Sequence, residues 1–239
     1  MKILVMHFST NHKTNFMYFL TIIVVLSILL ISLNIQPALS YTDNNLNLTK
    51  INLIQDQFNY KHIIGIIQNN GNKTVSHIII SFNFLDSGNK SIGNFSKQSE
   101  ITTLNPKEIT PFDILIFDKK IYDKIKDLTM DIKYNFTNYK SKMLAIVSKN
   151  SHLDINGFYF INGQILNNAQ AYSNNTTVTS ITYNKNNELA GVWKAQTEPY
   201  AIPPLTTASF SIPVTNKIQS FQISNYTVLV ESDKFTIQK

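Results

Sequence analysis

The chain of 239 residues contains no cysteine, seven glycines and one tryptophan. Without cysteine there are no disulfides, no thiolate chemistry and no Cys-ligated metal, so stability must come from packing alone. The scarce glycines form no phosphate-binding loop and no Gly-x-Ser-x-Gly elbow, and His-Glu-x-x-His is absent as well. We therefore expect a non-enzymatic protein that uses no cofactor.

Charge is also sparse, because only 15% of the residues are Asp, Glu, Lys or Arg. The formal net charge of +6 is spread singly along the chain and predicts a diffuse solvated surface, with no nucleic acid partner. The histidines show no ligand spacing, so no metal site is expected; they are His7, His12, His62, His77 and His152. Acid pairs such as Glu100/Glu108 and Asp123/Asp127 are expected to be solvated surface.

What the sequence has in quantity is hydrophobic and aromatic residues, at 43% and 11%. With Ile, Thr, Tyr, Phe and Asn abundant, this composition favours strands over a charged helical bundle. We therefore expect an all-β protein.

The amino-terminal 40 residues have the composition of an export signal. Basic residues without an acid precede the apolar run Phe16–Leu33, and Ala38-Leu39-Ser40 fits signal peptidase cleavage before Tyr41. The run of about 18 residues is also close to the minimum for a membrane span, so a cleaved signal and an uncleaved hydrophobic helix both remain open. In either case the positive charge places the amino end in the cytoplasm and the rest of the chain on the extracellular side of the cytoplasmic membrane, secreted or anchored.

The remainder of the chain is a tandem duplication, because Gly65 recurs as Gly163 and many other positions recur with the same offset of 98 residues. The offset carries Ile67 to Ile165, Asn69 to Asn167, Asn70 to Asn168, Leu104 to Ile202, Pro106 to Pro204 and Phe112 to Phe210. A glycine inside both copies of an apolar strand indicates a bulge or a close backbone approach. Whatever the protein recognises is expected where the two copies differ.

Within each copy the pattern is that of short antiparallel strands. In Val75–Leu85 every second residue is apolar, with Ile79 the exception, and Leu128–Phe136 alternates in the same way. Asp86-Ser87-Gly88-Asn89 and its counterpart Asn184–Asn187 predict hairpin turns, and the charge pattern of Lys119–Asp127 predicts a short helical crossover. Strands at this spacing favour a β-sandwich.

We therefore expect two tandem immunoglobulin-like antiparallel β-sandwiches preceded by an N-terminal hydrophobic helix. The boundaries are 1–40 for the signal peptide or anchor, 41–55 for a tether and edge strand, 56–140 for the first domain, 141–153 for a short linker or edge strand, and 154–239 for the second domain.

Gly-x-Ile-x-Asn-Asn in one strand, Phe82-Asn83-Phe84-Leu85-Asp86 ending the next, and Leu-x-Pro followed by Phe112 resemble the FxLYD domain family. Phe82 and Asp86 match the motif, while Phe84 and Leu85 stand where Leu and Tyr are expected. The second copy keeps only Tyr183, with Ser180 and Asn184 at the motif's ends. The resemblance covers both copies and implies immunoglobulin-like modules of exported or membrane-anchored archaeal and bacterial proteins, without catalytic residues.

Two kinds of candidate site remain. N-glycosylation acceptors occur at Asn47, Asn72, Asn89, Asn94, Asn135, Asn174, Asn175 and Asn225. Trp193 and Tyr200 are a candidate aromatic platform for sugar or peptide, against the alternative that they pack at a loop of the sandwich.

The sequence thus predicts an exported cell-envelope protein with a structural or protein-interaction role. Its expected partners are the membrane, through residues 16–33 if the leader is retained, and another envelope protein. The alternative is a surface ligand-binding subunit centred on Trp193 and Tyr200.

Overall fold

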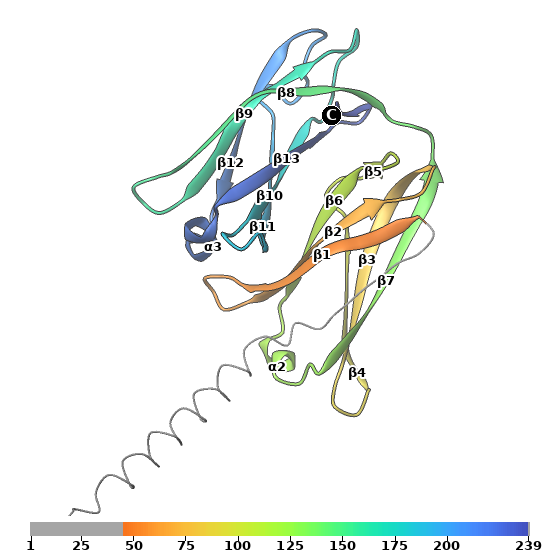
Figure 1. The fold of residues 1–239 in the computed structure, drawn as a ribbon, viewed down its shortest axis with the longest axis vertical. Helices are drawn as coiled ribbons and strands as arrows, with labels where there is room; N and C mark the ends of the chain where they lie inside the picture. The colour runs from red at the N-terminus through yellow and green to blue at the C-terminus, as the bar shows by residue number, and fades with distance from the viewer. Residues whose placement is uncertain (1–44, 239) are drawn as a thin grey trace, which may run out of the picture. The chain divides into compact units, whose positions relative to one another are not determined.

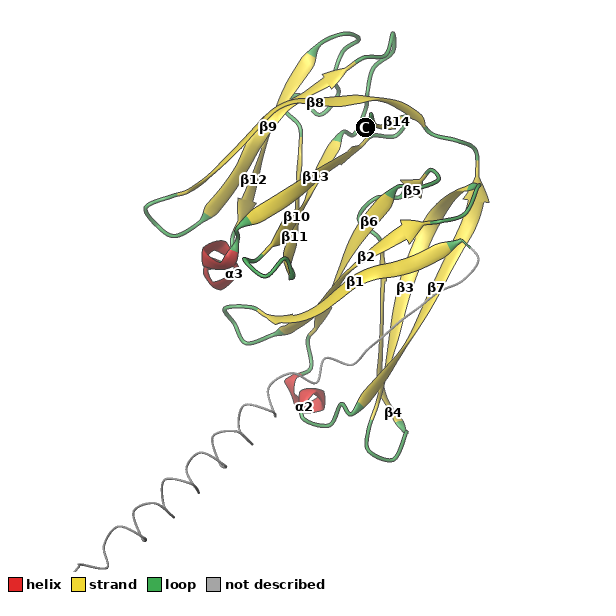
Figure 2. Ribbon diagram, viewed as in Figure 1, coloured by secondary structure: helices red, strands yellow, loops and turns green. Residues whose placement is uncertain are grey.

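The computed structural model describes residues 45–238, and the leader and most of the tether lie outside these residues. The described part consists mostly of β-strands in antiparallel sheets, with two short helices (Figure 2). The all-β prediction is therefore confirmed. Within residues 45–238 no helix has the length and apolar character needed to cross a membrane.

The first half, residues 46–137, contains two antiparallel sheets. Its elements are β1 (Leu46–Gln55), β2 (Lys61–Asn69), β3 (Thr74–Leu85), β4 (Ser91–Gln98), β5 (Thr103–Leu104), β6 (Ile109–Ile116), α2 (Lys119–Tyr122) and β7 (Asp127–Thr137). One sheet has the order β1-β2-β6; in the other, β3 pairs with β4, β5 and β7 (Figure 1). The Lys119–Asp127 segment therefore contains the expected short helix.

The second half, residues 141–237, has one continuous seven-stranded sheet in the order β11-β10-β13-β14-β8-β9-β12. Its elements are β8 (Ser141–Leu153), β9 (Tyr159–Asn167), β10 (Thr177–Tyr183), β11 (Leu189–Gln196), β12 (Thr207–Val214), α3 (Lys217–Gln222), β13 (Asn225–Glu231) and β14 (Phe235–Ile237). The elements β9, β11, β12, α3 and β13 each begin 98 residues after β2, β4, β6, α2 and β7.

The second half differs from the sequence expectation in two ways. Residues 141–153, expected to be a short linker or edge strand, form the 13-residue strand β8, which pairs with β9 on one side and with β14 on the other. The β8–β14 pair is parallel, whereas purely antiparallel sheets were expected. The physical reason is that β14 turns back from β13 and fills the space beside β8, where it satisfies backbone groups that an edge would leave unpaired. Three residues are too few to show a strand pattern in a sequence.

Each half has its own buried core, and the alternation in β3 builds the first one. Ile78, Ile80, Phe82 and Phe84 are almost fully buried, while Ile79 is 41% exposed on the opposite face. The matching core of the second half centres on Ile161, Ile165, Val178, Phe210 and Ile212. Burial of one such side chain stabilises the folded state by roughly 1.5–3 kcal/mol, so the alternating faces account for the sheets.

The repeated glycine lies under an aromatic ring in both halves. Gly65 pairs across strands with Phe112, and Gly163 pairs with Phe210. A Cβ atom at either glycine would collide with the facing ring, and at Gly163 it would also collide with the backbone oxygen of Ser148. The close approach expected from the sequence is confirmed, and it explains why glycine stands inside both strands.

The buried asparagine that follows this strand is also repeated with its contacts. Asn69 donates from Nδ2 to the carbonyls of Lys73 and Leu104, both at 2.9 Å, and accepts from the Gly71 N–H at 3.0 Å. Asn167 makes the equivalent bonds to Ala171 O, Ile202 O and Ala169 N. Each carboxamide thus ties the turn after the strand to the Leu-x-Pro or Ile-Pro-Pro corner, and a buried amide needs these partners.

Four hairpin turns share one chemistry, including the two predicted from the sequence. The first turn residue accepts backbone N–H groups two and four positions later, and the fourth residue has a positive φ. The first residues are Asp56, Asp86, Asp154 and Asn184, and the fourth residues are Asn59, Asn89, Gly157 and Asn187. Asn and Gly are the residues that accept this left-handed conformation at the lowest cost, so the turns fix the strand register.

Candidate functional site

The two halves meet through an apolar cluster that belongs to neither core. Ile64 and Ile66 point from the outer face of β2, and Ile181, Tyr183 and Leu189 come from β10 and the start of β11. All five are at least nine-tenths buried. Four of them are isoleucine or leucine side chains, and they bury apolar surface of one half against the other. This cluster, which we call the inter-half cluster, therefore holds the halves together.

A buried carboxylate lies at one side of this contact. Glu231, at the end of β13, accepts hydrogen bonds from the Thr102 and Thr103 N–H groups at 2.7 and 3.1 Å and from Thr102 Oγ1 at 3.0 Å. It also pairs with Lys140 Nζ at 2.7 Å, and the two side chains are 8% and 10% exposed. Because hydrogen bonds to charged groups are stronger than neutral ones, this node fixes the segment before β5 against the second half.

Glu100 and Glu108 were expected to be solvated surface residues, and this prediction is wrong, because both side chains are only 6% exposed. Glu100 pairs with Lys194 and Lys97, both at 2.7 Å, and Glu108 pairs with Lys142 at 3.2 Å. Lys194 and Lys142 belong to the second half, so these two ion pairs cross the contact. Their burial could not be predicted from the sequence, because the lysine partners lie up to 94 residues away.

The lysines also decide the titration of Glu100. Burial alone raises the pKa of this carboxyl, but the hydrogen bonds and charges of Lys194 and Lys97 outweigh burial and lower its pKa below the ordinary value of 4.5. Glu100 is therefore ionised at neutral pH, and its contribution to stability is lost as the pH falls through the lowered pKa.

A polar pocket of about 400 Å³ opens between the halves at these charged groups. Glu100, Lys140, Lys194, Glu231 and Asp233 line it together with the hydroxyl groups of several threonines and a serine. The charged side chains satisfy one another or nearby backbone groups, as the Asp233–Asn175 hydrogen bond of 2.8 Å also does. The pocket is thus a polar recess between the halves whose charged side chains are already paired.

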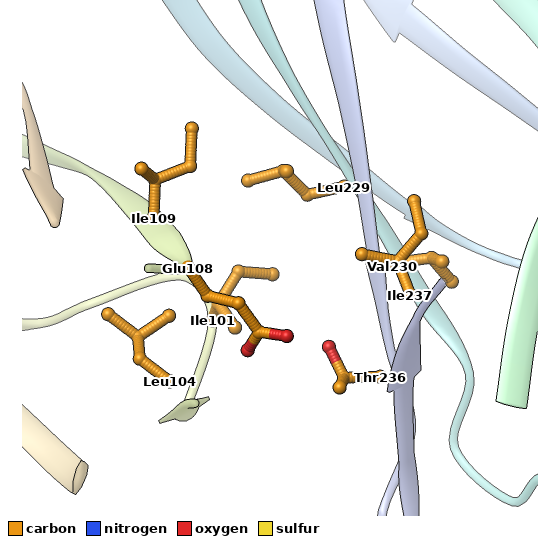
Figure 3. Close-up of a pocket in the computed structure, with 8 residues that line it drawn as sticks. All are labelled: Ile101, Leu104, Glu108, Ile109, Leu229, Val230, Thr236 and Ile237. Atoms are coloured by element: carbon orange, nitrogen blue, oxygen red, sulfur yellow. The ribbon is translucent and has the colours of Figure 1, made fainter. Parts of the chain in front are cut away.

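A second cavity of about 40 Å³ lies close by and is mainly apolar (Figure 3). Ile101, Leu104, Glu108 and Ile109 of the first half face Leu229, Val230, Thr236 and Ile237 of the second half across it. The halves therefore contact each other through an apolar centre with a small void and a charged rim.

Away from this contact, His62 lies between two carboxylates of the first half. Its Nδ1 is 2.8 Å from Asp113 Oδ1, and its Nε2 is 3.6 Å from Asp56 Oδ2. Burial alone lowers the pKa of His62, but the hydrogen bond and charge of Asp113, with help from Asp56, raise it above the ordinary 6.5. Across residues 45–238 no group of three or more His, Cys, Asp or Glu side chains is arranged to hold a metal ion.

The candidate glycosylation sites lie on the surface of both halves. Asn47, on β1, is partly exposed, and the other seven are exposed: Asn72, Asn89, Asn94, Asn135, Asn174, Asn175 and Asn225. Glycans require such exposure, and their presence stays a prediction.

The two residues of the candidate aromatic platform, Trp193 and Tyr200, differ in their burial. Trp193 is partly buried, packs against the core of the second half and lies over Gly191, where a Cβ would come within 2.5 Å of its Nε1 atom. Tyr200 is 59% exposed in the loop before β12. No ring contact joins the two residues within the described part of the chain, and the platform stays a prediction.

Sequence reasoning missed the residues of the inter-half contact, although a signal for them exists. The outer-face residues Ile64 and Ile66 stand where the second copy has Asn162 and Gln164, and Glu231 stands where the first copy has Lys133. A strand that is apolar on both faces in one copy, and on one face in the other copy, indicates that the first strand is covered on its outer face as well.

No protein-family model and no curated protein sequence matches the chain. Among solved structures, an Amycolatopsis orientalis exo-chitosanase is similar over 79% of this chain and 26% of its own, with 8% identity and a TM-score of 0.28. A red sea bream transglutaminase is similar over 80% of this chain and 32% of its own, with 8% identity and a TM-score of 0.24. The chain spans about a quarter to a third of these proteins, and likenesses this weak carry no argument about activity.

Proposed function

We propose that this chain is a non-enzymatic, exported cell-envelope protein in which two tandem immunoglobulin-like modules of the FxLYD kind act as one rigid structural or interaction unit. The observation that carries the proposal is the contact between the halves. A buried apolar cluster, the Glu231 node and two crossing ion pairs hold two repeats in one arrangement. Such a unit presents its edges and turns at fixed positions, which is what a spacer or docking protein requires.

Binding in this proposal uses the strands at the sheet edges. β4 ends one sheet of the first half and β12 ends the sheet of the second half. An edge strand offers unpaired backbone N–H and C=O groups to which a partner adds a strand. The proposed partner is another envelope protein, and the leader supplies export and, if it is retained, the anchor.

Export is tested with the full chain carrying a carboxy-terminal epitope. We expect the epitope in the envelope or outside the cell, where protease added to intact cells removes it, and the mass of the product reports whether cleavage occurs before Tyr41. The matched control places Arg at Val25 and Leu26 inside the apolar run, where each charge opposes insertion by about 2.5–3.5 kcal/mol. A protease-protected epitope in the cytosol with the natural leader would contradict the proposal.

The interaction role is tested by photo-crosslinking in cells. A photoreactive residue at the exposed Gln98 on β4 is compared with one at the exposed Thr207 on β12. We expect a discrete adduct with an envelope protein from at least one edge. If neither edge gives an adduct in cells that export the chain, the edges are not the interaction sites.

A further inference from the structure

Six large apolar side chains are exposed around the turns at one end of the β1–β2 and β8–β9 hairpins. They are Leu53, Phe58, Phe117, Ile155, Ile218 and Phe221, with exposed fractions from 48% to 102%. Phe58 and Ile155 lie in the two turns, Phe117 follows β6, and Ile218 and Phe221 belong to α3. We call these residues the hairpin-tip surface.

The structure brings these segments together. Lys119 donates to Phe58 O at 2.7 Å, which connects the segment after β6 to the β1–β2 turn. The Lys217 N–H donates to Gln57 Oε1 at 3.2 Å, which connects that turn to α3. A Cβ on Gly157 would lie 3.1 Å from the Phe221 ring, so α3 also contacts the β8–β9 turn. Figure 2 shows the β1–β2 turn next to α3, with the β8–β9 turn beyond it.

A hollow of about 420 Å³ lies within this surface. Leu53 and Ile54 of β1 line one side, and Ile218, Gln219 and Gln222 of α3 line the other. Two of the six exposed apolar residues, Leu53 and Ile218, thus face each other across a recess between the two halves.

The fold does not require apolar residues at these positions, because the other copy has a polar residue at every one. The counterparts, 98 residues away, are Ser151, Asn156, Thr215, Gln57, Lys120 and Asp123 for Leu53, Phe58, Phe117, Ile155, Ile218 and Phe221. The same hairpins and helices therefore form with polar side chains. A set of exposed apolar residues that folding does not need is the mark of an interaction surface.

The charges beside these residues favour an anionic partner. Lys119 lies 4.3 Å from the centre of the Tyr60 ring, and Lys217 lies 5.0 Å from that of Phe158. The nearby carboxylates of Asp56, Asp154 and Asp118 stay charged but accept backbone N–H groups of their own turns or helix, and neither lysine forms an ion pair with them in residues 45–238. Exposed Phe and Ile beside Lys is the combination that lies in the headgroup region of a bilayer.

The length of the chain before β1 is compatible with a membrane at this end. The eleven residues between Leu33 and Asn45 reach at most about 36–40 Å. The ten residues of β1 carry the chain about 34 Å from Leu46 to the β1–β2 turn. The chain between Leu33 and Asn45 is therefore long enough to match the length of β1.

We propose that the hairpin-tip surface docks onto the headgroup region of an anionic lipid bilayer, with Phe58, Ile155 and Phe221 inserted and Lys119 and Lys217 facing lipid phosphate. The inference rests on the proposed envelope location, and it adds an orientation in which the module pair lies against the membrane.

The test uses the full chain in vesicles of phosphatidylcholine and phosphatidylglycerol. Because the chain has no cysteine, I155C carries a nitroxide at that position alone. We expect a label about 5–10 Å below the headgroups, relaxed by lipid-dissolved oxygen and shielded from an aqueous relaxation agent. The matched control is Y172C in the loop after β9, at the far end of that strand from the β8–β9 turn, where we expect a label in water.

A second set of variants uses the residues of the other copy, which the fold accepts. With the label at F117C, the change F58N/I155Q/F221D is expected to remove lipid contact, and K119E/K217E is expected to weaken it on anionic vesicles. Sedimentation after a carbonate wash reports separately whether the chain is anchored.

The outcomes are distinguishable. An anchored chain with a water-exposed I155C label overturns the docking and leaves the envelope proposal in place. A chain that washes off and does not rebind vesicles overturns the docking and the retained anchor, while export is decided separately by the protease test on intact cells. Rebinding with a buried label supports docking without an anchor. Spin–spin broadening at I155C that rises with protein concentration would assign the surface to a second copy and overturn the membrane proposal.

Discussion

The two halves of this protein share a frame and differ in their outward faces. Gly65 and Gly163 each lie under an equivalent phenylalanine ring, and Asn69 and Asn167 share three equivalent hydrogen bonds. Yet β2 turns Ile64 and Ile66 outward, where β9 has Asn162 and Gln164. The residues that both copies share therefore specify the fold of each half. The outer-face residues in which the copies differ specify how the two halves pack together.

The outer faces that make no contact between the halves are polar. The first half packs its β2 face onto the β10 face of the second half, which is a heterologous contact. If both copies kept both faces, further chains would add in the same way and form filaments. The unused faces are instead polar, with Asn162 and Gln164 on β9 and Asn83 on β3 where β10 has Ile181.

The largest effect is expected from making the first half resemble the second at the contact. I64N/I66Q replaces two buried isoleucines of the inter-half cluster with their counterparts, and we expect a loss of about 5 kcal/mol in the free energy of unfolding. Chemical denaturation measures it. The change I79N, at a partly exposed position on β3, is the control and should cost less than about 1 kcal/mol. Equal losses would show that the cluster does not couple the halves.

A smaller loss is expected from removing the repeated asparagine in either half. N69A removes hydrogen bonds to two carbonyls and one N–H, and N167A removes bonds to three carbonyls and one N–H. Each change is expected to cost about 3 kcal/mol. The comparison shows whether the halves unfold together: one shared transition in both variants indicates coupling, and two transitions indicate independent halves. N70A, at the exposed neighbour, should leave stability within about 0.5 kcal/mol of the natural chain.

The Glu231 node is expected to contribute about 2 kcal/mol. E231A leaves Lys140 and the Thr102 and Thr103 N–H groups without their carboxylate, in a site that is largely closed to water. K133A changes the counterpart in the first half, which is exposed, and should have no measurable effect. Similar denaturation midpoints for E231A and the natural chain would show that Glu231 does not stabilise the contact between the halves.

The outer faces that make no contact between the halves can be made apolar by substitution. N83I/N162I/Q164I places isoleucines on both of them, and we expect weak self-association at concentrations of about 10 µM and above. N83I alone and N162I/Q164I alone carry one face each and should stay closer to the natural sedimentation behaviour. A triple variant that sediments like the natural chain up to about 100 µM would show that other features limit the assembly.

The smallest effect is expected from His62, whose counterpart in the second half is Phe160. Its pKa is raised in the folded state, so its contribution is full below pH 6.5 and is lost as the pH rises through the raised pKa. We expect stability to fall by less than about 1 kcal/mol between pH 6 and pH 8, and H62F to flatten that slope. H152F changes an exposed histidine and is expected to leave the dependence of stability on pH unchanged.

Most strands, the hairpin turns and the repeat could be predicted from sequence patterns alone. Alternation at Ile78, Ile80 and Phe82 marked a buried face, and Asp86 with Asn89 marked a turn, because both signals come from residues within one element. The sequence did not determine the strand β14, which is three residues long, or that β8 lies inside a sheet. Those depend on which backbone edges remain to be paired.

The roles of the outward-facing residues became clear only from contacts between distant parts of the chain. Ile64, Tyr183 and Glu231 are far apart in the chain, and an apolar or acidic residue on the outer face of a strand has no meaning until its neighbour is known. The inter-half cluster, the burial of Glu100 and the joining of Phe58 to Phe221 at one surface all come from contacts between the two copies. The physical reason is that burial and charge pairing depend on distance in space, whereas a sequence pattern reports only the period of its own element.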